Sequence, residues 1–139
     1  MLLDKSYYEH FSSIFEENMR VIFKDNVIKI SKEHDYKRRG FFRLSYKYLP
    51  YNYKIIIENE FRAFDIIIED EEGASNVLYR IKHFDNSLDE NNINKAIQIL
   101  KKVLENNNFN FYFHIGDKTY RKNSDGIKRV KDLKELLNG

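Results

Sequence analysis

The sequence predicts an α+β fold in which an antiparallel sheet of about six to eight strands carries its helices on one face. Apolar residues show helical spacing in two places, near the N-terminus and over 89–106. Short β-rich runs separated by turn residues lie between and after these two segments, and no regular β–α–β alternation appears. These observations favour a single α+β domain over 1–139, with both helices packed on the same face of the sheet.

Three helices are expected from the spacing of apolar residues. The first spans 3–18, with a stripe formed by Leu3, Tyr7, Phe11, Ile14 and Phe15. The second spans 89–106, where Asp89 can cap the start. Its apolar face consists of Ile93, Ala96, Ile97, Leu100, Val103 and Leu104. A short last helix is expected over 132–137.

The β-rich runs alternate or are dense in branched residues. Residues 19–23 and 27–31 predict a hairpin around the turn 24–26, and the polar stretch 32–40 predicts a loop or a hairpin tip. Further strands are expected at 41–48, 53–58, 62–69, 77–83, 109–115 and 118–122. The isoleucine triplets 55–57 and 66–68 do not alternate, so we expect their strands to be central in the sheet or covered on both faces.

Composition excludes several classes of protein. Cysteine is absent, which excludes disulfides, thiol catalysis and zinc sites built from Cys. The net charge is +2, from 24 basic and 22 acidic residues, so the whole chain has no strong attraction to nucleic acid or to an anionic membrane. The apolar runs are far shorter than the ~20 residues that span a bilayer, and the first residues do not resemble a signal peptide. We therefore expect a cytoplasmic protein with no membrane partner.

The sequence contains no familiar catalytic motif. Its glycines are isolated among turn residues, so no phosphate-binding loop is expected. Its four histidines lack the spacing of metal ligands, and no serine lies in a nucleophile elbow. On a strand His83 and Asp85 would share a face, which leaves open an enzyme with an unfamiliar site. Otherwise the sequence predicts no enzyme, no cofactor and no metal.

Two adjacent segments of opposite charge are the candidate binding surfaces. In the basic–aromatic stretch 36–54 cations interleave with Phe and Tyr, which is typical of a surface for single-stranded nucleic acid and also of a β-hairpin that lies over a core. It supports an alternative function in nucleic-acid binding or regulation, although the near-neutral total charge argues against it.

The acidic block that follows is the preferred site for a protein partner. Its negative charge can steer a basic domain toward it, and its phenylalanines can provide apolar contacts that anchor that domain. Its candidate residues are Glu58, Glu60, Phe61, Phe64, Asp65, Glu69, Asp70, Glu71 and Glu72. The competing interpretation is that Lys and Arg of the preceding strand neutralise these carboxylates inside the protein.

The C-terminal third carries a resemblance to a known class. The segment Ile93–Gly126 reads INKAIQILKKVLENNNFNFYFHIGDKTYRKNSDG, a long helix followed by an aromatic strand and a GDKTYRK hairpin. It resembles small immunity proteins found beside polymorphic toxins in Firmicutes. Abundant Asn, Lys, Ile and Tyr with only three Ala also indicate the genome of a bacterium low in G and C, or of one of its phages. The resemblance implies a cytoplasmic, single-domain, non-catalytic inhibitor that binds one cognate toxin, and it assigns no residue a role.

Overall fold

The computed structural model describes residues 5–132 and 134–138, and it confirms the α+β class with an eight-stranded antiparallel sheet. The strands follow one another in the sheet in chain order. The elements are α1 (Lys5–Phe23), a 3-10 turn (Lys24–Asn26), β1 (Val27–Asp35), β2 (Phe41–Tyr48), β3 (Tyr53–Glu60), β4 (Ala63–Glu69), β5 (Ser75–Val77), α2 (Leu78–Ile81), α3 (Glu90–Asn106), β6 (Phe111–Ile115), β7 (Lys118–Asn123), β8 (Gly126–Arg129) and α4 (Lys134–Asn138).

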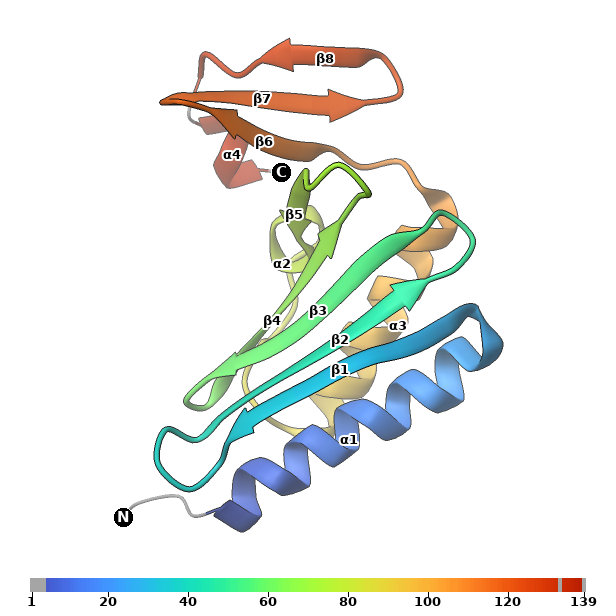
Figure 1. Cartoon of the computed structure of the whole chain (residues 1–139), viewed down its shortest axis with the longest axis vertical. Helices are drawn as coiled ribbons and strands as arrows, with labels where there is room; N and C mark the ends of the chain where they lie inside the picture. Colours follow the sequence, from blue (N-terminus) through green and yellow to red (C-terminus); the bar gives the residue numbers. More distant parts are fainter. Residues whose placement is uncertain (1–4, 133, 139) are drawn as a thin grey trace.

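The core lies between the two long helices and one face of β2–β4. Figure 1 shows α1 running beside β1 and α3 lying behind the central strands. Alternate residues of the strands point at the helices and are buried, namely Phe42, Leu44, Tyr46, Tyr48, Ile55, Ile57, Phe64, Ile66 and Ile68. The helices contribute Phe15, Met19, Ile93, Ile97, Leu100 and Leu104 to the same core. Burial of this apolar surface is the main force that holds the two layers together.

The opposite face of the sheet, called here the open face, carries mostly charged side chains. Arg43, Lys47 and Lys54 lie on it, while Ile56 and Ile67 at its centre are only partly buried. The isoleucine triplets are therefore central in the sheet, as expected, but they are covered by helices on one face only.

The first helix is longer than the sequence predicts. Met19–Phe23 forms its last turn and not a strand, because Met19 and Phe23 extend the buried helical stripe of Tyr8 and Phe15. The residues expected to form a hairpin turn instead join helix to strand, and Lys24 ends the helix with a φ of 52°. β1 then continues to Asp35, so the expected loop 32–40 shrinks to the turn after that residue. Leu3, the first member of the expected stripe, lies outside the described residues.

The expected strand over 77–83 is wrong beyond Val77, where the chain turns into the short helix α2. Burial explains this local structure, because the helical turn places Leu78 fully in the core and leaves Tyr79 exposed. The second long helix is confirmed, with the Asp89 carboxylate accepting hydrogen bonds from the backbone N–H groups of Asn91 and Asn92. The expected last helix is observed as Lys134–Asn138, and Asp132 is not helical.

The last three strands form a hairpin unit that meets the main sheet at a narrow joint. β5 and β6 are paired only through Ser75 and Tyr112 in the described residues, and Figure 1 shows β6–β8 turned away from β1–β4. The buried Asn76 side chain reinforces the joint by donating a hydrogen bond of 2.8 Å to the carbonyl of Asn110. Ile115, at the end of β6, is exposed because the strand has left the main sheet by that point.

Candidate functional site

β4 divides the acidic block into two groups. Its seven residues span about 20 Å at ~3.3 Å per residue, and the two groups lie at its opposite ends. Glu58, Glu60, Phe61 and Asp65 lie near the β3–β4 turn, whereas Glu69, Asp70, Glu71 and Glu72 lie at or in the β4–β5 turn. Phe64 belongs to neither surface, because it is 1% exposed in the core against Phe15. The block is therefore two surfaces, and Phe61 is its only exposed aromatic side chain.

In the β4–β5 turn, one carboxylate is largely buried and maintains the fold, whereas two others are exposed on the surface. One Asp70 oxygen accepts the backbone N–H groups of Glu72 (3.0 Å) and Ala74 (2.9 Å), and the other lies 2.8 Å from the Lys122 ammonium. Lys122 also pairs with Glu72 at 3.0 Å, and these two carboxylates raise its pKa. The Asp70 side chain is 9% exposed, whereas that of Glu72 is 79% exposed. Asp70 therefore closes the turn, while Glu71 and Glu72 face solvent.

The acidic turn borders a hollow of about 360 Å³ where the hairpin unit meets the main sheet. Its lining comprises Tyr51, Tyr53, Asp70, Glu71, Glu72, Asn107, Phe109, Phe111, Lys122, Asn123 and Ser124. We call this feature the acidic hollow. The sequence did not predict that residues 107–111 form one wall of this hollow. No local pattern relates them to Tyr51 and Tyr53, which lie some fifty positions earlier.

Aromatic contacts hold the floor of the acidic hollow. The Tyr53 ring lies 5.1 Å from that of Phe111 and 5.5 Å from that of Tyr51. Its hydroxyl donates a hydrogen bond of 2.7 Å to the Asn107 side chain, and burial raises its pKa. Tyr51 remains 43% exposed at the mouth. The hollow thus combines a preformed aromatic floor with an anionic rim.

The other end of β4 carries a crowded set of carboxylates. Glu58 is paired with Arg43 of the neighbouring strand at 2.7 Å, as the competing interpretation of the sequence expected. Asp65 lies directly opposite Glu58 in the strand register. Partial burial, followed by repulsion from Glu58 and Glu60, raises the pKa of Asp65. This end of the open face is therefore only partly neutralised.

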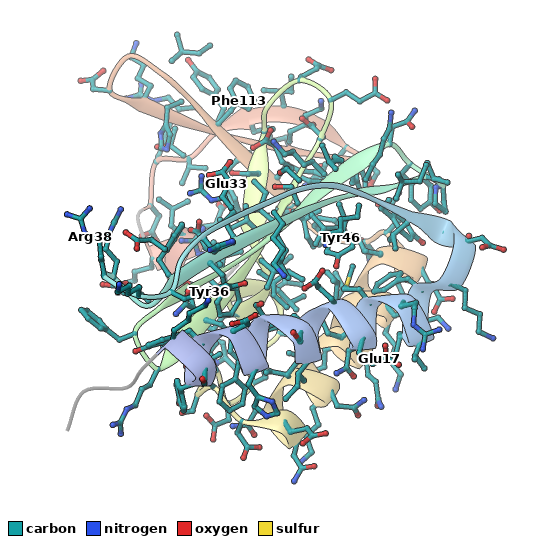
Figure 2. The ribbon with its side chains drawn as sticks, turned by 60° about the horizontal axis from the view of Figure 1, so that its bottom comes forward. Glu17, Glu33, Tyr36, Arg38, Tyr46 and Phe113 are labelled. Carbon is teal, nitrogen blue, oxygen red and sulfur yellow. The ribbon has the colours of Figure 1, made fainter. Side chains whose placement is uncertain are left out.

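The basic–aromatic stretch 36–54 does not form an interleaved platform. Its aromatic residues Phe42, Tyr46 and Tyr48 face the helices and are buried. Its cations Arg43, Lys47 and Lys54 lie on the open face, since alternate residues of a strand point to opposite sides. Tyr36 is buried too, where its hydroxyl is 2.8 Å from that of Ser12, and Figure 2 shows it between the strands and α1. Among the described residues, the cation–ring contacts of this stretch are those of Arg39 and Arg43 with Phe41, at 5.5 Å and 5.9 Å from the ring centre.

His83 and Asp85 do not form a catalytic pair. His83 follows α2 and stacks on Tyr79 with ring centroids 4.8 Å apart. The Asp85 carboxylate accepts the backbone N–H of Ser87 at 3.0 Å, and this hydrogen bond lowers its pKa. No hydrogen bond joins the two side chains in residues 5–132 and 134–138. The same ranges contain no group of three side chains placed to hold a metal ion.

Comparison with protein-family models gave no match, and comparisons with curated proteins and with solved structures gave no significant match. Nothing in them indicates an enzyme. Among the helices of the described residues, none is long and apolar enough to cross a membrane.

Proposed function

We propose that this protein is a non-catalytic, cytoplasmic binding module of the immunity type, which holds and neutralises a basic toxin domain at the acidic hollow. The observation that carries the proposal is the placing of two exposed carboxylates, Glu71 and Glu72, on the rim of a preformed aromatic floor. Aromatic residues supply much of the affinity at protein interfaces, and charge of one sign on the rim speeds association with an opposite charge.

The contacts within the hollow favour binding over chemistry. Asp70 and Glu72 already share the Lys122 ammonium, and Asp70 is held by two backbone N–H groups. These contacts engage the oxygens of Asp70 and Glu72 as hydrogen-bond acceptors and ion-pair partners, which supports a binding role for the hollow. The carboxylates on the rim therefore serve as negative charges that attract a partner.

The walls of the acidic hollow are held in place before binding, which supports a high affinity for the partner. The Lys122 ion pairs, the Tyr53–Asn107 hydrogen bond and the aromatic contacts fix the walls before a partner arrives. A rigid surface loses little conformational entropy on binding, so more of the contact energy becomes affinity. A Lys or Arg side chain of the partner can reach Glu71 while the partner's apolar surface covers Tyr51.

The test is charge reversal measured against the cognate partner, identified from the genomic neighbourhood or by cross-linking in the source cells. Glu71→Lys combined with Glu72→Lys should slow association about tenfold and weaken its salt dependence. The matched control, Glu9→Lys with Glu33→Lys, changes the net charge equally at two exposed positions away from the hollow and should change association far less. Equal effects of the two double variants would reject the acidic hollow as the docking site.

A further inference from the structure

A second exposed surface lies at the opposite end of the main sheet from the acidic hollow. The β1–β2 and β3–β4 turns lie side by side there and border a shallow hollow of about 600 Å³. Its lining is Arg38, Arg39, Gly40, Phe41, Arg43, Glu58, Asn59, Glu60 and Phe61. We call this surface the tip. Figure 2 shows the Arg38 side chain extending away from the body of the protein at this end.

Phe61 is an unfavourable residue for the fold at its position. Its side chain is 70% exposed, so the core gains little from it. Its backbone has a φ of 52°, in the left-handed region that Gly or Asn adopts more easily than a bulky aromatic residue. A residue that is both strained and exposed at a turn indicates a binding role, because folding alone favours a different side chain there.

The buried Asn59 side chain fixes the conformation in which Phe61 projects. Its amide donates hydrogen bonds to the carbonyls of Gly40 (2.7 Å) and Phe61 (3.0 Å), and its oxygen accepts the backbone N–H of Phe42 at 2.8 Å. One side chain therefore ties the two turns of the tip together. The cost of ordering Phe61 is met in the free protein, which favours binding through a rigid anchor.

The tip also presents cations that the described residues do not neutralise. Within residues 5–132 and 134–138 no ion pair engages the side chains of Lys37, Arg38 or Arg39, whereas Arg43 is paired with Glu58. The Arg39 guanidinium lies 5.5 Å from the centre of the Phe41 ring. Phe and Arg are both enriched at protein interfaces, and Arg is frequent among the residues that carry most of the binding energy.

The charge pattern favours a protein partner over nucleic acid. Glu58 and Glu60 lie in the same hollow as the arginines, and they would repel a continuous phosphate backbone. A single exposed ring is also too little for the successive stacked bases that single-strand binders hold. A protein surface can place separate carboxylates opposite Arg38 and Arg39 and avoid Glu60.

We propose that the tip is a second docking surface, which inserts Phe61 into an apolar pocket of a protein partner while Arg38 and Arg39 pair with carboxylates on the rim of that pocket. Its charge is opposite to that of the acidic hollow, and it lies at the other end of the sheet. The tip therefore binds a partner whose surface is acidic. This proposal does not depend on whether the acidic hollow binds a basic toxin.

The experiment selects peptides from a phage-displayed random library on the purified full-length protein, with counter-selection on Phe61→Asn. Asn tolerates a positive φ, so this variant should be at least as stable as the parent, and lost binding then reports the side chain and not misfolding. Selected peptides should combine apolar residues with Asp or Glu. Synthetic versions should bind at least tenfold more weakly to Phe61→Asn and to Arg38→Glu/Arg39→Glu. Glu71→Lys/Glu72→Lys, at the acidic hollow, should bind them like the parent.

Three results would overturn the proposal. The first is a selection that yields no Phe61-dependent peptide, or only basic ones. The second is a fluorescent single-stranded or duplex oligonucleotide that binds at low salt more tightly than the selected peptides do, with this binding abolished by Arg38→Glu/Arg39→Glu. The third is concentration-dependent self-association in sedimentation that Phe61→Asn removes, which would make the tip a contact between copies of this chain. None of them bears on the acidic hollow, whose test uses different variants.

Discussion

Replacing Asn59 with Ala should be among the most destabilising single changes in the protein. Asn59 is 5% exposed, and its three hydrogen bonds reach the backbone of both turns of the tip and of the start of β2. The bonds to Phe42 and Gly40 are buried, so Ala would leave an N–H and a carbonyl without partners where water has poor access. Each such group costs about 1–3 kcal/mol, which gives about 4 kcal/mol for the pair. That is a large part of the ~5–15 kcal/mol that stabilises a typical domain.

Urea denaturation measures this cost directly, provided that the slope of the transition stays constant. Asn94→Ala is the matched control, because Asn94 is half-buried and its amide donates to the side chain of Asn18 between two helices. Water can replace that bond, so the control should lose less than about 1 kcal/mol. If Asn59→Ala lost no more stability than Asn94→Ala, Asn59 would not be what holds the tip.

Two further changes test local features. Gly40→Ala should cost about 1–3 kcal/mol more than Gly116→Ala in urea denaturation. Both glycines have a φ near 60°, but only at Gly40 would the added Cβ lie 2.4 Å from the buried Tyr8 ring; equal losses would contradict this packing. Asp65→Asn should raise the free energy of unfolding at neutral pH by about 0.5 kcal/mol, because it removes a charge directly opposite Glu58. Folding raises the pKa of Asp65 above its ordinary 3.8. Below pH 3.8 the side chain is protonated in both the folded and the unfolded protein, so its charge weakens the fold only as the pH rises above that value. The gain should vanish below pH 3.8, and a gain independent of pH would refute the electrostatic origin.

Local pattern was sufficient where one element contains its own signal. The helix α3 needs only its apolar face and the Asp89 cap, and β2 needs only turn residues on either side of a β-rich run. The acidic block was recognised for the same reason, since its residues are neighbours in sequence. Its division into two surfaces was not, because that depends on β4 being extended between them.

What the sequence by itself determined about this protein is the α+β class, the two long helices and the central isoleucine strands. The tertiary structure decided where α1 ends and that Leu78 begins a helix, since burial against distant residues outweighs a short alternating pattern. It also brought Lys122 into an ion pair with Asp70, 52 positions away, and the Tyr53 ring into contact with that of Phe111. The physical reason is that periodicity reports which face of an element is apolar, whereas a site requires the register and the angle at which elements meet, and these are set by packing over the whole chain.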